Sequence, residues 1–418
     1  MTRPGSNLRS NPTRLWDSLM QMAEIGPGVA GGNNRQTVSD ADGEGRALLA
    51  KWGEAEGLAL TVDRMGNMFL RLEGSDPDAA PVLVGSHLDT QPTGGRFDGV
   101  LGVLAGLEVI RTIREQGLKT RHPVVLVNWT NEEGARFAPS LMGSGVFTGR
   151  LRQEDMDDSR DLDGLRFGDE ITRIGWRGEA EARAFPIHAL LEYHIEQGPI
   201  LEAEGIPIGI VTHTQGCNWI EIEVTGSAAH TGSTPMGARK DAARGAARIV
   251  EAVHAIAMRH QPNAVATIGH VEVSPNSRNV IAGRVVMTAD LRSHIPTVQD
   301  AMTAELLAEA PRICAELGLG FHYKMLEAVP ASTFDETLLD RLRAAADRLG
   351  LPHRDIISGA GHDACNINDI APTAMLFCPC VDGISHNEAE EISPEWAAAG
   401  CDVLLHAVLE TAGLEGAA

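Results

Sequence analysis

Aromatic side chains and positive charges are scarce in this chain. Phe, Trp and Tyr make up 4% of the 418 residues, and 35 Lys and Arg stand against 57 Asp and Glu, for a formal net charge of −22. Few aromatic rings argue against a surface that stacks nucleic acid bases. The negative charge disfavours binding to DNA, RNA or anionic lipid. Nucleic acid and membrane surfaces are therefore not expected as partners.

Long apolar runs and a regular cysteine framework are also missing. No run is long enough to span a bilayer, and the polar segment 1–13 lacks the apolar core of a signal peptide. The six cysteines are scattered, which favours reduced thiols and a cytoplasmic location. Cys378 and Cys380 flank a single proline and do not have C-x-x-C spacing. A buried pair at a strand end is favoured over a metal or redox site.

Alternating helix and strand patterns indicate an α/β fold. Their spacing predicts a mixed, largely parallel sheet with helices on both faces. The expected helices are 12–22, 40–55 and 99–116, and the expected strands are 58–63, 68–72, 81–85 and 124–129. The same pattern resumes later with a helix over 335–349 and a strand over 373–377.

A different pattern occupies the middle of the chain. From residue 216, the period-two alternation typical of a half-solvated strand begins a β-α-β-β-α-β series, the ferredoxin-like arrangement. The chain therefore divides into a discontinuous catalytic domain, 1–213 with 327–418, and an inserted domain, 214–326, for which we expect a lid and dimerisation role.

Metal-ligating side chains gather where apolar strands end. Carboxyl ends of strands in open α/β sheets are where ligand sites lie. The side chains stand in Gly85–Thr90, Gly94–Gly99, Asn131–Gly134, His194–Gly198 and Ser385–Asn387. The recurrence of such side chains at several strand ends supports a metal site. A lone His near an Asp is more often a surface or core residue, and a Glu-Glu pair is usually a solvated helix face.

Together these motifs contain the inventory of a two-metal hydrolase. His87 and His194 are predicted to bind one divalent ion, Glu133 and His386 the other, and Asp98 both. Zn²⁺, Mn²⁺, Co²⁺ and Ni²⁺ all suit such a site.

Two further carboxylates have predicted roles at this site. Glu132, beside the ligand Glu133, is placed to take a proton from water and return it to a leaving nitrogen. Asp89, two residues after His87, is expected to accept a hydrogen bond from a ligand imidazole and fix its tautomer.

These motifs resemble the M20 metallopeptidase superfamily, and within it the amidase/carbamoylase branch. That branch contains N-carbamoyl-L-amino acid hydrolases, β-ureidopropionases and allantoate amidohydrolases. The resemblance runs from about residue 14 to 410 and rests on GSHLDTQPTGGRFDG, NEEGARF, HIEQGPILE, GSAAHTGSTPMGARKDA, SRNVIAG, DLR, SGAGHDA and GISHNEAE. His194 stands where peptidase relatives carry an acidic residue, which indicates the carbamoylase side.

The resemblance implies the same five metal ligands, and Glu132 as general base and acid supported by Asp89. It implies that His230 stabilises the oxyanion in the active site of the other subunit of a homodimer. It also implies substrate contacts from Gln197, His230, Asn279, Arg292 and His362. The guanidinium group of Arg292 suits a substrate carboxylate, because it can bind both carboxylate oxygens. The sequence departs from the family at Ala282, in the turn that follows Asn279, where relatives usually carry a proline.

The expected reaction is hydrolysis of an N-carbamoyl α- or β-amino acid to the amino acid, ammonia and CO₂. Allantoate or ureidoglycolate hydrolysis is the nearer alternative, and N-acyl-amino acid or dipeptide hydrolysis a more distant one. A catalytically inactive scaffold is the alternative from another class. It should have lost a ligand or the base, and all six residues are present.

Overall fold

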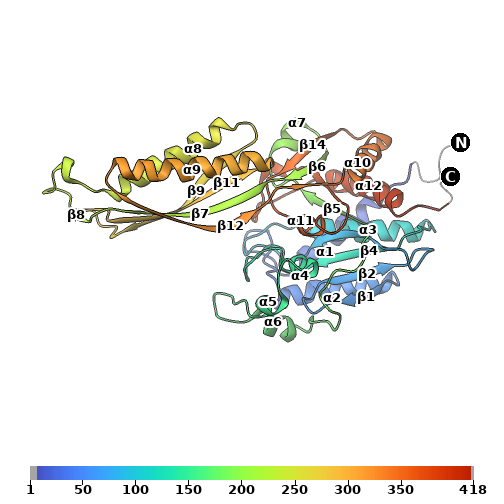
Figure 1. Cartoon of the computed structure of the whole chain (residues 1–418). Helices are drawn as coiled ribbons and strands as arrows, with labels where there is room; N and C mark the ends of the chain where they lie inside the picture. Colours follow the sequence, from blue (N-terminus) through green and yellow to red (C-terminus); the bar gives the residue numbers. More distant parts are fainter. Residues whose placement is uncertain (1–6, 416–418) are drawn as a thin grey trace. The chain divides into compact units, whose positions relative to one another are not determined.

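Two large sheets and one two-stranded sheet organise residues 7–415, the part of the chain that the computed structural model describes (Figure 1). Unit 1 runs to Thr212 and resumes at Phe334, and unit 2 is His213–Thr333. The sequence placed the divisions at 213/214 and 326/327. The second division of the structure lies later because the last long strand of unit 2 continues to Val329.

Unit 1 is built on the larger sheet, with strand order β1-β2-β4-β3-β5-β15-β6-β13 and β14 beside β6, in which the two-residue β13 comes from the closing residues of unit 2. The strands are β1 (Ala59–Val62), β2 (Met68–Leu72), β3 (Val82–His87), β4 (Val124–Trp129), β5 (Ala189–Ile195), β6 (Ile208–Thr214), β13 (Ser332–Thr333), β14 (His353–Ser358) and β15 (Thr373–Cys378). The central four strands, β4, β3, β5 and β15, are mutually parallel and fully buried, as their continuous apolar sequences predict. Antiparallel strands flank them, so the predicted mixed, largely parallel sheet is confirmed.

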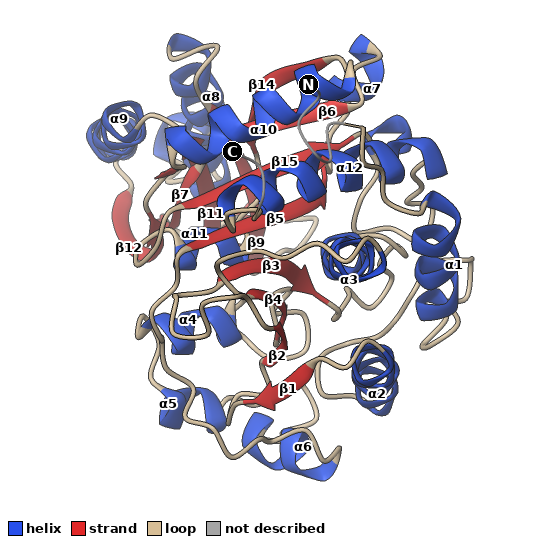
Figure 2. Ribbon diagram, turned by 90° about the vertical axis from the view of Figure 1, so that its right-hand side faces the viewer, coloured by secondary structure: helices blue, strands red, loops and turns tan. Residues whose placement is uncertain are grey.

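Helices cover both faces of this sheet (Figure 2). They are α1 (Pro12–Ala23), α2 (Asp40–Ala55), α3 (Val100–Glu115), α4 (Met142–Thr148), α5 (Gln153–Asp157), α6 (Phe167–Arg173), α7 (Ile200–Glu204), α10 (Glu336–Leu349), α11 (Asp363–Ile367) and α12 (Pro394–Thr411). On β5, the Tyr193 hydroxyl donates to the Trp396 carbonyl of α12 at 3.0 Å, whereas Glu192 accepts from the Ala364 amide of α11 at 3.1 Å. Because successive strand residues point to opposite faces, α12 and α11 lie on opposite sides of the sheet.

Unit 2 contains an antiparallel sheet with strand order β12-β7-β11-β9. Its elements are β7 (Gly216–Thr225), β8 (Ala229–His230), α8 (Ala242–Arg259), β9 (Val265–Ser274), β10 (Val280–Ile281), β11 (Arg284–Ser293), α9 (Pro296–Glu316) and β12 (Gly320–Val329). Alternate residues of β7 are buried, among them Ile220, Ile222 and Val224, and they share one core with α8 and α9. The predicted β-α-β-β-α-β order is confirmed, and the short β8–β10 ladder is an addition that the sequence pattern did not indicate.

All six cysteines are free thiols. Cys378 ends β15 and is buried together with Cys380, as the interpretation of a strand-end pair predicted. Among residues 7–415, no helix is both long and apolar enough to cross a membrane.

Candidate active site

The four central strands of unit 1 bring the predicted motifs to one edge of the sheet. His87 is the last residue of β3, and His194 is next to the last of β5. Glu132 and Glu133 follow β4, and His386 follows β15. Carboxyl ends of adjacent parallel strands meet at the same edge, so residues far apart in the sequence come together there.

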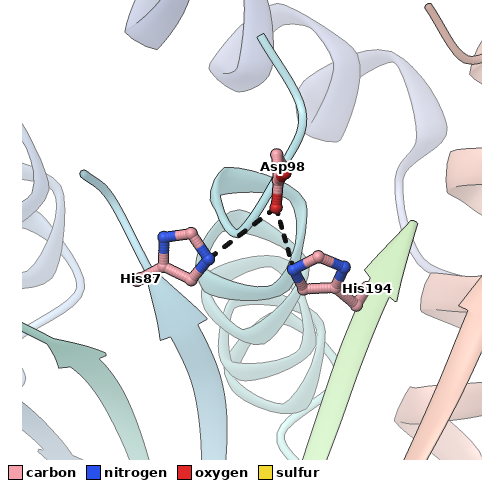
Figure 3. Close-up of side chains that lie close together, drawn as sticks. All are labelled: His87, Asp98 and His194. Atoms are coloured by element: carbon pink, nitrogen blue, oxygen red, sulfur yellow. Dashed lines mark ion pairs between the residues drawn. The ribbon is translucent and has the colours of Figure 1, made fainter. Parts of the chain in front are cut away.

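His87, Asp98 and His194 form the first of two candidate metal-binding groups (Figure 3). Oδ1 of Asp98 lies 3.8 Å from His87 Nε2 and 3.1 Å from His194 Nε2. All three side chains are buried. Asp98 stands just before α3, so a loop side chain completes a group that two strands begin.

The second candidate group consists of Asp98, Glu133 and His386. Nε2 of His386 lies 3.3 Å from Asp98 Oδ2 and 3.3 Å from Glu133 Oε2. Asp98 therefore directs one carboxylate oxygen to each group, which is the arrangement predicted for a residue shared by two ions. His386 is half exposed, so the second group is the one open to solvent.

Both buried imidazoles are oriented by main-chain carbonyls. His87 Nδ1 lies 2.9 Å from the Asp89 carbonyl oxygen, and His194 Nδ1 lies 2.9 Å from that of Ile195. A proton on each Nδ1 leaves Nε2 with a free lone pair, as a metal ligand requires. His87 Nε2 is buried and has no hydrogen-bond partner, so a cation bound there would satisfy an otherwise unpaired atom. The donor set thus fits a divalent metal.

The role expected for the Asp89 carboxylate needs correction. Its Oδ1 lies 3.9 Å from His87 Nδ1, beyond hydrogen-bond distance, because the carbonyl of the same residue takes that position. The carboxylate instead accepts the backbone N–H groups of Glu132 and Glu133, each at 3.3 Å. Asp89 thus holds the acidic turn, and its main chain orients the imidazole.

Gly99 allows the close approach of Asp98 and His87. A Cβ at this position would lie 2.3 Å from the His87 ring, and the backbone φ of +68° is one that side-chain-bearing residues rarely adopt. Gly99 also caps the start of α3. The glycine that the motif places after Asp98 is therefore required by space and by backbone conformation.

The pKa shifts of two ligand candidates indicate a site that a bound cation would stabilise. Burial lowers the pKa of His87 to about 4, which leaves this imidazole neutral at pH 7. Burial also raises the pKa of Glu133 to about 8, and the charge of Asp98 adds to this rise. A bound divalent cation would oppose both the desolvation and the repulsion of these carboxylates.

Glu132 lies beside the first group, with Oε2 3.5 Å from His87 Nε2. Burial raises the pKa of this carboxyl well above its usual range, and the charges of Asp363 and Glu133 raise it further. A buried carboxyl whose pKa is raised by its surroundings is the kind of group that transfers protons in active sites.

Backbone strain marks the turns that carry these residues. Asn131, Gln197 and His386 have φ values of +58°, +57° and +53°. Such conformations persist where the surroundings hold them, and at Asn131 the side-chain amide does so by donating to the carbonyls of Phe137 at 2.8 Å and Pro139 at 3.1 Å. This turn lies between β4 and the acidic pair Glu132 and Glu133.

Two of the predicted substrate residues lie at this edge of unit 1. Gln197 Nε2 donates to Asp98 Oδ2 at 2.9 Å, while its Oε1 is buried without a partner. His362 is buried with its ring against that of His194, at a centroid distance of 4.7 Å, and its Nε2 lies 2.8 Å from Ser358 Oγ.

Three predicted substrate residues lie in unit 2. His230 is exposed on β8, and its Nδ1 accepts from the Gly232 amide at 3.0 Å. The β8–β10 ladder pairs His230 with Val280, which places Asn279 beside it. Arg292, near the other end of β11, is held by Asp290 at 2.9 Å. Unit 2 therefore brings His230 and Asn279 together but keeps Arg292 apart.

Two buried carboxylates at the site were missed from the sequence. Glu192 lies on the same face of β5 as His194, and it accepts from Ser86 Oγ at 2.6 Å and from the Ala364 amide. Glu390 accepts the backbone N–H of Asp98 at 3.0 Å. The available signal was an acid within a buried apolar strand in the first case, and an acid four residues after a metal ligand in the second.

The model of peptidase family M20/M25/M40 matches residues 83–410. This protein belongs to that family. It is 58% identical over 412 residues to an N-carbamoyl-L-amino-acid amidohydrolase of Rhizobium meliloti, with 99% of both chains covered. It is 36% identical to an N-carbamoyl-L-amino acid amidohydrolase of Geobacillus stearothermophilus, over 96% of this chain and 98% of the relative.

The fold is also that of a solved family member. A crystal structure of an amidase of the hydantoinase/carbamoylase family from Burkholderia multivorans matches with a TM-score of 0.93 and 50% identity, over 97% of this chain and 98% of the other. The resemblance seen in the motifs is thereby confirmed for the family and for the mixed α/β fold.

Proposed function

We propose that this protein hydrolyses N-carbamoyl amino acids to the amino acid, ammonia and CO₂. The observation that carries the proposal is the pair of candidate metal groups sharing Asp98, with Glu132 beside them. The 58% identity to a relative with this named activity supports the same substrate class.

Two divalent ions, Zn²⁺, Mn²⁺, Co²⁺ or Ni²⁺, form part of the proposal. His87, Asp98 and His194 would hold one ion, and Asp98, Glu133 and His386 the other. When bound, the ions supply Lewis acidity that lowers the pKa of water and polarises a carbonyl group. Their charge also favours the ionised form of Glu132, the form that accepts a proton.

The proton transfers belong to Glu132. It takes a proton from the attacking water, whose oxygen bonds to the carbamoyl carbon. It then delivers that proton to the amino acid nitrogen as the carbon–nitrogen bond breaks. The released carbamic acid decomposes to ammonia and CO₂. Asp89 contributes by holding the main chain of Glu132 through its N–H group.

The substrate roles of the remaining residues are proposed from the family motifs. Arg292 binds the substrate carboxylate through its two-pronged guanidinium. His230 donates to the developing oxyanion. Gln197, Asn279 and His362 contact the amide portion.

The geometry of unit 2 supports a homodimer in which each active site receives His230 from the partner subunit. β10 directly precedes the Arg284 end of β11 and pairs with β8, whereas Arg292 lies near the opposite end of β11. At about 3.3 Å per residue, β11 separates Arg284 from Arg292 by about 26 Å. One chain therefore cannot bring its own His230 and Arg292 to one small substrate without reshaping unit 2. The cytoplasmic location expected from the sequence stays a prediction.

Substrate turnover tests the proposal. Protein loaded with Mn²⁺ or Zn²⁺ is assayed for ammonia release from N-carbamoyl-L-amino acids, N-carbamoyl-β-alanine, allantoate and ureidoglycolate. Release of free amino acid from N-acetyl amino acids and dipeptides is followed by mass spectrometry. Turnover of a carbamoyl amino acid above all others is the expected result. Exclusive turnover of allantoate, ureidoglycolate or an acyl compound would overturn the substrate assignment.

A further inference from the structure

Glu390 contacts two segments of the candidate metal site, the main chain at Phe97 and Asp98 and the turn that carries His386. Its Oε1 accepts the backbone N–H groups of Phe97 and Asp98, both at 3.0 Å. Its Oε2 lies 3.0 Å from Ser385 Oγ, and the same hydroxyl lies 3.0 Å from Asp98 Oδ2. One carboxyl group thus contacts the main chain of Asp98, the residue shared by both groups, and the residue before the ligand His386.

The surroundings leave Glu390 little freedom. Its side chain is buried, and a Cβ on Gly95 would lie 2.0 Å from its Oε1, so only glycine fits beside it. The backbone N–H of Glu390 donates to the Asn387 carbonyl at 3.0 Å, which closes the turn after His386. The carboxylate is therefore held on one side by the Gly95 segment and on the other by its own turn.

Burying this carboxylate beside Asp98 is costly for the fold. A buried acid normally needs a cationic partner as well as hydrogen bonds. Within residues 7–415, no Lys or Arg forms a salt bridge with Glu390. An amide of the same shape would keep an oxygen for the two N–H groups without placing a second charge near Asp98. The position is thus better suited to organising a cation site than to stabilising the chain.

We propose that Glu390 is a positioning residue for the metal centre. It holds the backbone of Asp98 so that Oδ1 faces His87 and His194 and Oδ2 faces Glu133 and His386, and its Oε2 lies against the Ser385 hydroxyl in the turn that carries His386. This inference rests on the proposed use of two metal ions. Partners of this kind, one step removed from the metal, affect metal affinity or activity by about 10–100-fold.

Metal binding in the absence of substrate tests this role. The whole protein and its Glu390→Gln, Ser385→Ala and Glu391→Gln variants are stripped with a chelator and titrated with Co²⁺ against a competing indicator. The visible absorption of bound Co²⁺ reports its coordination. Glu391→Gln is the matched control, because the same chemical change is made one residue away on an exposed side chain.

Glu390→Gln is expected to weaken binding of at least one Co²⁺ by about 10–100-fold and to alter its absorption, since the variant loses the negative charge beside the site and places an NH₂ donor where Oε2 meets the Ser385 hydroxyl. Ser385→Ala is expected to cause a smaller loss in the same direction, and Glu391→Gln none. Melting temperatures of the metal-free proteins check that each variant is folded. Wild-type Co²⁺ affinity in folded Glu390→Gln would overturn the proposal, even if its melting temperature falls. If Glu390→Gln does not fold, Ser385→Ala decides on the same criterion.

Activity provides a second readout. Excess Co²⁺ should restore most of the kcat of Glu390→Gln while KM stays near the wild-type value, because the defect lies in metal occupancy. A purely structural role would not respond to added metal. Wild-type protein that binds two Co²⁺ but hydrolyses no carbamoyl compound would refute the proposed reaction and leave the role of Glu390 standing.

Discussion

The candidate residues of unit 1 and those of unit 2 differ in how they are held. In unit 1, His87 and His194 are buried, and a main-chain carbonyl orients each ring. In unit 2, His230 is exposed on a two-residue strand and Arg292 is paired with Asp290 within its own strand. The first pair lies within a candidate metal-binding group. The second pair lies outside both such groups, on strands of unit 2.

This difference matches the two proposed roles, metal binding in unit 1 and substrate contact in unit 2. Metal chemistry requires ligands placed to a fraction of an ångström, which buried strand ends achieve. Substrate contacts must form and release in every turnover, so exposed side chains on a separate unit suit them. Substitutions in the two units should therefore produce different kinetic defects.

Asp98→Ala should have the largest effect, because it removes the carboxylate shared by both metal groups. Loss of both the Lewis acid and the activated water should reduce kcat by more than about 10⁴-fold. The measurement is ammonia release together with bound metal per chain. Retention of two tightly bound ions would contradict the bridging arrangement.

Glu132→Gln should reduce kcat by about 10²–10⁴-fold, because the proton acceptor is lost while the ligands remain. Metal content should stay at the wild-type level, which separates this variant from Asp98→Ala. The exposed Glu44→Gln serves as the matched control and should leave both quantities unchanged. Full activity with metal bound would remove Glu132 from the mechanism.

His230→Ala should reduce kcat by about 10²–10³-fold, the effect of losing one oxyanion donor, and should leave metal content unchanged. Mixed dimers sharpen the test. Subunits carrying His230→Ala and subunits carrying Arg292→Ala are co-expressed, and one of the two active sites in each mixed dimer then has both residues intact. Recovery of activity is expected, and its absence in verified mixed dimers would argue against exchange of His230 between subunits.

Arg292→Lys should have the smallest effect, an increase in KM of about 10-fold with little change in kcat. Lysine keeps the charge but loses the two-pronged contact with a carboxylate. The matching measurement uses a carbamoyl substrate whose carboxylate is amidated, for which wild type and variant should show similar KM values. An equal loss with both substrates would place Arg292 away from the carboxylate.

Much of this molecule could be predicted from local patterns. The helices α2 and α10 and the strands β2 and β4 lie close to their predicted bounds, because cap residues and continuous apolar runs carry strong local signals. The ladder of β8 with β10 was not predicted, since two-residue strands have no periodicity to detect.

Part of the candidate site could also be predicted from the sequence. Four of the five ligand candidates stand at or after the ends of parallel strands, and Asp98 follows in the loop before α3, so both candidate metal groups could be anticipated. Glu390 and Glu192 could not, because their importance depends on which amides and hydroxyls they meet after folding. The orientation of Asp89 was mispredicted for the same reason, since two acceptors of one residue competed for one imidazole proton.

Residue types and their spacing were thus enough to predict the family, the α/β architecture and the five candidate metal-ligating side chains. These depend on residue type and spacing, which are local properties of the chain. Folding was needed to establish that Glu390 and Asp89 hold the surrounding main chain, and that Arg292 lies far from His230 within unit 2. Hydrogen-bond partners and distances arise from packing between distant segments, and spacing along the chain does not encode them individually.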